Sequence, residues 1–145
     1  MLSVDMVQKN DPEVGTPEYV SLRSRDQTRR QQVQRMMDHQ VDTAQDYYHA
    51  ALIFQHGEAV DEIWSAHLWA LKSVELGIQS GKWLAAALDR WHLYQGQPQK
   101  YGTQLVPNGT RYRLWDLDSS TTDQERAQWD DPSLAEMAGR AAQFN

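Results

Sequence analysis

The chain contains no cysteine, and none of its apolar runs approaches the roughly 18 residues that a membrane-spanning helix needs. Without cysteine the protein cannot build a disulfide framework, a thiolate zinc site or a thiol nucleophile. Residues 1–16 also lack the apolar stretch that is typical of a signal peptide. From these absences we expect a soluble protein of the cytoplasm with no membrane partner.

Basic residues are outnumbered, because 14 lysines and arginines face 20 aspartates and glutamates, which gives a net charge of −6. A net acidic chain binds polyanions poorly, so no nucleic-acid partner is expected. Only residues 21–40 are locally basic, with five arginines against two aspartates, and that composition is typical of a solvated helix face. The length of 145 residues suits one domain. We expect residues 1–20 to be extended or flexible and residues 21–145 to form a single helical domain.

Apolar residues recur at helical spacing over most of the chain, which predicts a mainly α fold: a small bundle of about five to six helices. Helix starts are marked by capping residues such as threonine and serine, and helix ends by glycines. Helices are predicted at about 24–38, from Thr43 to Gly57, at about 60–76 with a stop at Gly77, from Ser80 to Gly96, after Thr121 or Thr122, and from Asp131 onward.

The periodicity changes near residue 103. Two short runs of β-forming residues flank Asn108-Gly109, a dipeptide that favours a tight turn. One short β-hairpin is therefore predicted near residues 103–115.

Helix arithmetic brings two polar residues to the same height. His67 lies ten residues before Gly77 and Asp89 lies nine residues after Ser80. At a rise of about 1.5 Å per residue, both lie roughly 14 Å from the turn between the two helices. Since a tight connection makes the helices antiparallel neighbours, we predict an Asp–His pair across their interface. Alone, a histidine on an apolar helix face is more often a hydrogen-bonded core residue than a catalyst.

A metal site is an alternative that we weigh less. Asp46 and His49, and again Asp89 and His92, are spaced as Asp-x-x-His, which places a carboxylate and an imidazole on one helix face. Dinuclear sites in helical bundles use such pairs, but normally with glutamates and with two further glutamate ligands. Asp46 is also explained as part of a helix cap. We therefore predict no metal and no other cofactor.

Several segments together resemble a bacterial family of domain of unknown function 6624, over roughly residues 22–140. They are 50–57 with its Gln-His-Gly, Ala66-His67, 82–90 with its Asp-Arg, and 96–104 with its Gln-x-Tyr-Gly-Thr-Gln. Weaker similarity lies at Asp26 with Arg29 or Arg30, and at Thr122-Asp123 with Arg126. The family has no assigned activity, so the resemblance implies shared polar positions and no reaction. His49 and His92 fall outside the shared pattern, which argues further against a metal.

Polar positions spread over three helices and a loop are typical of a convergent site, so we predict an acid–base enzyme acting on a small polar, possibly anionic, metabolite. Hydrolysis, cyclisation or elimination would fit. The predicted catalytic residues are His67, Asp89 and His56, and the predicted substrate-binding residues are Arg90, Gln55, Gln99, Tyr101, Thr103 and Gln104. The loop 95–104 can instead be a helix stop whose amides satisfy backbone groups. The alternative function is a non-catalytic interaction module, similar in style to tetratricopeptide helix pairs.

Overall fold

A computed structural model describes residues 15–39 and 41–143, and within them the chain forms six helices and one two-stranded antiparallel sheet. The predicted mainly α bundle with one short hairpin is confirmed. The elements are α1 (Pro17–Met37), α2 (Ala44–Phe54), α3 (Val60–Glu75), α4 (Lys82–Tyr94), β1 (Leu105–Asn108), β2 (Arg111–Leu114), α5 (Asp123–Gln128) and α6 (Leu134–Gln143).

The first helix is longer than its apolar pattern predicts. It begins at Pro17, because Thr16 accepts a hydrogen bond from the Tyr19 amide and proline at the first helical position needs no donor. The prediction of an extended or flexible segment over residues 1–20 differs from the structure at residues 17–20, which are helical. Residues 1–14 of that segment lie outside the described residues.

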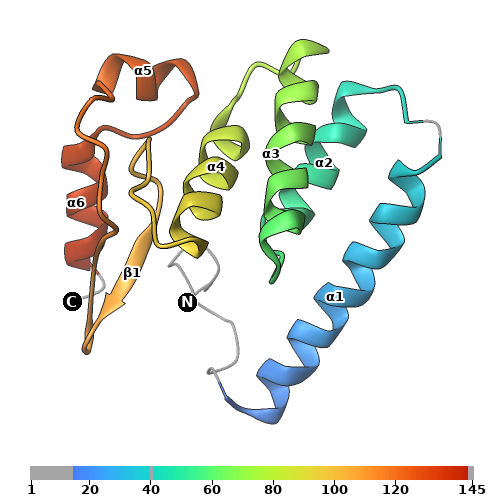
Figure 1. Ribbon diagram of the computed structural model, residues 1–145, viewed down its shortest axis with the longest axis horizontal. Coiled ribbons are helices and arrows are strands. Elements are labelled where there is room, and N and C mark those ends of the chain that lie inside the picture. The colour runs from blue at the N-terminus through green and yellow to red at the C-terminus, as the bar shows by residue number, and fades with distance from the viewer. Residues whose placement is uncertain (1–14, 40, 144–145) are drawn as a thin grey trace.

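Helices α1 to α4 lie side by side, each packed mainly against its neighbours in sequence (Figure 1). Alanines at the contacts of α2, α3 and α4 let these helices approach closely, and larger side chains fill the remaining space. Two core clusters result: Ala51, Ala70 and Leu84 with three tryptophans packed against them, and Phe54, Ala66 and Ala87 with Val33, Ile53 and Trp69. None of the described helices has both the length and the apolar character that crossing a bilayer demands.

The hairpin and the last two helices lie on the other side of α4 (Figure 1). Asn108 pairs with Arg111, so the turn consists of Gly109 and Thr110, and Gly109 has a φ of 66° that suits glycine. Helix α6 packs on β2, and Leu105, Met137 and Ala141 form a small separate core there. The hairpin therefore anchors the C-terminal helix.

The capping residues predicted from the sequence can be compared with those that the structure shows. Thr43 and Thr122 cap α2 and α5 as predicted, each accepting a hydrogen bond from the amide three residues on. The predicted cap of α4 by Ser80 is wrong. The helix is preceded by Gly81, and the Ser80 hydroxyl donates to Asp130 Oδ2 at 3.0 Å instead. This contact ties the start of α4 to the connection between α5 and α6.

Candidate functional site

Asp89 is completely buried and binds the loop that follows α4. Its Oδ1 accepts hydrogen bonds from the amides of Lys100 and Tyr101, both at 2.8 Å, and its Oδ2 accepts from the amide and hydroxyl of Thr103 at 3.0 and 2.7 Å. Burial raises the pKa of this carboxyl group, and the hydrogen bonds from Tyr101, Thr103 and Lys100 oppose the rise. All of these contacts hold the shape of the loop.

His67 serves a different partner, so the predicted Asp–His pair is wrong. Its Nδ1 lies 3.1 Å from the carbonyl oxygen of Leu84, and its ring lies 5.0 Å from that of Trp64. Burial lowers the pKa of His67. Two residues at equal height on neighbouring helices face each other only if each helix is also rotated suitably about its own axis. Here the four hydrogen-bond donors of the loop hold Asp89 toward residues 100–103.

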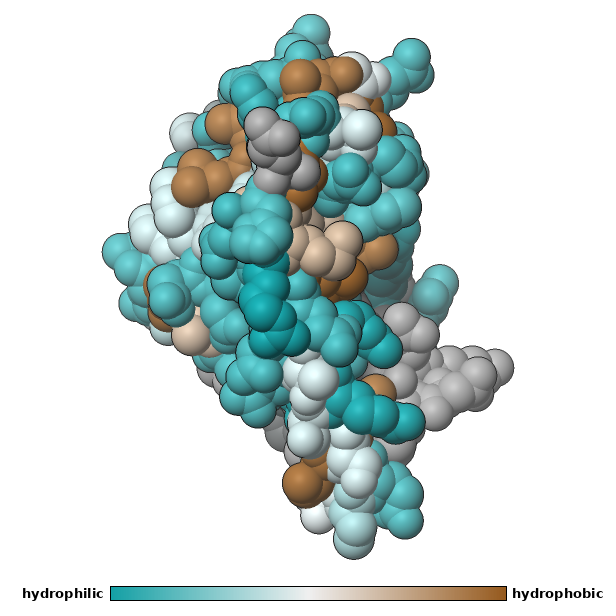
Figure 2. Space-filling view, turned by 90° about the vertical axis from the view of Figure 1, so that its right-hand side faces the viewer, coloured by the Kyte–Doolittle hydropathy of each residue, from teal (hydrophilic) through white to brown (hydrophobic). Residues whose placement is uncertain are grey.

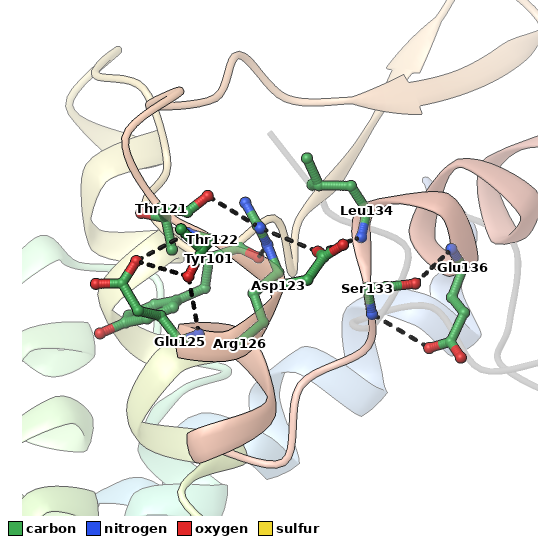
Figure 3. Close-up of polar contacts among 9 residues, drawn as sticks. All are labelled: Tyr101, Thr121, Thr122, Asp123, Glu125, Arg126, Ser133, Leu134 and Glu136. Atoms are coloured by element: carbon green, nitrogen blue, oxygen red, sulfur yellow. Dashed lines mark hydrogen bonds and ion pairs between the residues drawn. The ribbon is translucent and has the colours of Figure 1, made fainter.

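The loop 95–104 uses its polar side chains for its own structure. Gln99 donates to the carbonyl oxygens of Gln104 and Trp115 at 3.0 Å and accepts from the Gln104 amide at 2.8 Å. The buried Arg126 of α5 donates to the carbonyl oxygens of Tyr101 at 2.8 Å and Thr121 at 3.1 Å (Figure 3). These contacts favour the structural interpretation of the glutamine-rich loop over the predicted role in substrate binding.

The corner between α2 and α3 is held by two buried arginines. Arg90, which is completely buried, donates to the carbonyl oxygen of Gln55, and Arg30 donates to that of His56 at 3.4 Å. Carbonyl groups at the end of a helix have no intrahelical partner and carry partial negative charge, so guanidinium groups stabilise them. The contact of Arg90 that the structure shows is therefore with backbone, and its predicted role in gripping a substrate stays a prediction.

Glu62 completes this corner. Its Oε2 lies 2.9 Å from Arg30 Nε, while its Oε1 accepts from the amides of Glu58 and Ala59, both at 3.2 Å. The carbonyl groups of Gln55 and His56 are thus held from α4 and α1, and Glu62 of α3 holds Arg30 and the two residues after Gly57.

Gly57 is required at this corner by lack of space. A Cβ atom there would lie 2.7 Å from Glu62 Cβ and 2.9 Å from the carbonyl oxygen of Phe54. We expect Gly57→Ala to lower the free energy of unfolding by about 1–2 kcal/mol, because backbone on both sides must shift. Urea denaturation measures this change.

Gly139 of α6 is the matched control, because a Cβ atom there meets nothing within 4 Å and alanine favours a helix. We expect Gly139→Ala to be neutral or stabilising. A Gly57→Ala variant as stable as the unmodified protein would show that the corner tolerates a side chain.

His56 is half-buried and lines a cavity of about 250 Å³ between α1 and α2. Leu52 and Ile53 supply the apolar wall, and Asp26 and Arg29 of α1 supply charge. Asp26 Oδ1 and Arg29 Nη1 form an ion pair at 3.1 Å, in which the arginine side chain is 59 % exposed and the aspartate 23 %. We call this the His56 cavity.

Of the predicted site residues, only His56 lines the His56 cavity, and the structure does not bring the others to it. Gln55 is buried in the corner behind it, and its Oε1 has no hydrogen-bond partner in the described residues. Gln104, also buried, donates to Thr103 Oγ1 at 3.0 Å. Asp26 and Arg29 were absent from the predicted site, although the weaker part of the family resemblance includes both.

Searches with this chain against protein-family models, curated proteins and solved structures return no match. Within residues 15–39 and 41–143, no group of three or more histidine, aspartate and glutamate side chains is placed to hold a metal ion.

Proposed function

We propose that the protein is an enzyme that uses the His56 imidazole for acid–base chemistry on a small polar metabolite bound in the His56 cavity. One observation carries the proposal. Arg90 of α4 and Arg30 of α1 hold the backbone carbonyl groups of Gln55 and His56, and His56 lines a cavity that also contains a carboxylate and a guanidinium. A proton-transfer group held on a rigid corner is preorganised for catalysis.

Each residue of the His56 cavity has a part in this proposal. Imidazole is the side chain best suited to exchange a proton near neutral pH. The exposed guanidinium of Arg29 can bind a carboxylate or another anionic group of the substrate. Asp26 can accept a hydrogen bond from the substrate or from the imidazole. The Asp–His pair and the arginine anchor of the predicted enzyme are thus reassigned to Asp26, His56 and Arg29.

The volume of the His56 cavity limits the substrate. About 250 Å³ is below the roughly 300–1,000 Å³ of sites for drug-sized ligands, so the proposal is restricted to small metabolites. Hydrolysis, cyclisation and elimination all fit an acid–base group beside an anion anchor. A cytoplasmic, bacterial protein of the family of domain of unknown function 6624, acting without a cofactor, is part of the same proposal.

The test starts from a thermal-shift screen of small carboxylates and phosphate esters, followed by turnover assays of each compound that raises the melting temperature. We expect His56→Gln to retain binding of the substrate and to lose at least about a hundredfold in kcat, which is the usual contribution of a general acid or base. Arg29→Gln should raise KM more than it lowers kcat, because it removes an anchor and leaves the imidazole in place.

His49 of α2 offers a matched control. It is exposed, its Nε2 lies 3.0 Å from Gln45 Nε2, and it does not line the His56 cavity. His49→Gln should behave like the unmodified protein in both assays. Turnover by His56→Gln at the unmodified rate would refute the proposed role of His56.

The alternative of an interaction module is favoured by one face of α3. Trp64, Leu68 and Leu71 follow one another at helical spacing and are 37 %, 46 % and 37 % exposed. By contrast, the side of the molecule formed by α1 is mostly hydrophilic, with separated hydrophobic patches (Figure 2). Trp64→Ala with Leu68→Ala would abolish partner binding by such a module and leave turnover at His56 unchanged.

A further inference from the structure

A second cavity, of about 360 Å³, lies between the start of α4 and the connection from α5 to α6. Its polar lining consists of Lys82, Trp83, Thr103, Asp130, Asp131 and Arg140. It shares no residue with the His56 cavity, and α4 and α6 lie on the far side of α3 from α1 (Figure 1). We call it the Asp131 cavity.

The end of helix α5 determines where Asp131 lies. The Asp130 amide donates to the carbonyl oxygen of Ala127 at 3.1 Å, and the Asp131 amide donates to that of Arg126 at 2.9 Å. This is the hydrogen-bond pattern of a Schellman motif, in which Asp130 takes the left-handed position with a φ of 62°. Ser80 holds the Asp130 carboxylate from the other side, so the turn that presents Asp131 is fixed.

The lining of the Asp131 cavity contains polar groups with no partner in the protein. Trp83 Nε1 and Asp131 Oδ2 are buried without a hydrogen-bond partner in the part of the chain that the structure describes. Within the same residues, Arg140 forms no ion pair or hydrogen bond. Lys82 Nζ lies 4.8 Å from the centre of the Trp83 ring. Buried polar atoms without partners cost stability, and a ligand can supply the missing partner.

Proton binding turns Asp131 into a donor. Burial raises the pKa of Asp131 to about 8, and the negative charges of Asp89 and Asp130 add to the rise while Arg126 opposes it. At neutral pH the Asp131 carboxyl group is therefore mostly protonated and can donate a hydrogen bond. With Asp131 neutral, the two cations Lys82 and Arg140 outnumber the single carboxylate of Asp130.

We propose that the Asp131 cavity binds a small ligand carrying an oxyanion, a carboxylate or a phosphate, through Lys82, Arg140, Trp83 and Asp131. Every group assigned to the ligand is a donor or a cation, and an oxyanion supplies only acceptors. A cationic ligand would instead face the charges of Lys82 and Arg140. The inference is independent of the proposed chemistry at His56, since no variant of one cavity touches the other.

Binding of inorganic phosphate and of succinate, measured separately by calorimetry and by amide NMR shifts, tests the proposal. At pH 6.5 we expect at least one of the two to bind at millimolar concentration and to shift the Trp83 indole N–H resonance. Binding of phosphate alone assigns a phosphate ligand, and binding of succinate alone assigns a carboxylate. Arg140→Gln should weaken the binding tenfold or more, because it removes a charged donor.

The most informative variant is Asp131→Asn, measured by the pH dependence of binding. Asparagine keeps a hydrogen-bond donor at this position but does not gain or lose a proton with pH. Binding by the unmodified protein should weaken about tenfold per pH unit above pH 8, whereas binding by Asp131→Asn should stay constant. Arg111→Gln, at an exposed position of β2, is the control and should bind normally, and Lys82→Gln replaces Arg140→Gln if that variant fails to fold. The proposal is overturned if neither ion binds or if both cation variants bind as the unmodified protein does.

Discussion

Replacing Asp89 by asparagine is expected to lower the free energy of unfolding by about 3–4 kcal/mol. The carboxylate accepts four hydrogen bonds from Lys100, Tyr101 and Thr103 in an environment with no exposed surface. An asparagine has one acceptor oxygen, and its NH₂ group would face the Thr103 amide, which is also a donor. Two buried donors then oppose each other, and the loop 100–103 loses its anchor.

Urea denaturation followed by circular dichroism measures this loss, and Asp116→Asn provides the control. Asp116 is exposed and bonds Arg113 at 3.0 Å, so its substitution should change the free energy of unfolding by less than about 0.5 kcal/mol. If Asp89→Asn unfolds at the same urea concentration as the unmodified protein while losing function, then Asp89 acts in the chemistry and the structural assignment fails.

Local sequence signals predict most of the helices and the hairpin well. The helix ends include one motif that such signals do not reveal. Gly77 and Gly96 mark the ends of α3 and α4, and both occupy the left-handed position of a Schellman motif, with φ of 116° and 72°. Helix α5 ends with the same hydrogen bonds, but aspartate takes the place of glycine. The motif is therefore invisible in the sequence at Asp130, and so is the placement of the next residue, Asp131.

The candidate site depends on contacts that no local pattern encodes. Counting residues along two helices gives the height of His67 and Asp89, but not the rotation that directs one to Leu84 and the other to the loop. Likewise, the sequence suggests that Arg90 is an anchor for an anion, but the structure shows that it donates to the carbonyl oxygen of Gln55. Buried arginines and aspartates look the same in a sequence whether they hold backbone or bind a substrate.

Asp131→Asn is expected to stabilise the protein at alkaline pH, a result opposite to that of Asp89→Asn. The pKa of Asp131 rises from 3.8 to about 8 on folding, so between these values the folded state holds a proton that the unfolded state has released. Stability contributed by this group is present below about pH 4 and is lost as the pH rises toward 8. Asparagine never releases a proton and avoids that loss.

The expected difference between Asp131→Asn and the unmodified protein grows from near zero at pH 4 to about 3 kcal/mol at pH 8, since part of the carboxyl group meets solvent and the full shift is not realised. Urea denaturation at intervals of one pH unit measures this difference. A group that destabilises the protein at neutral pH and yet is held rigidly in a cavity is typical of a binding site, because function and stability place opposite demands on it. A constant difference for Asp131→Asn would mean that the Asp131 carboxyl group is ionised at neutral pH, and the donor assigned to it would then be absent.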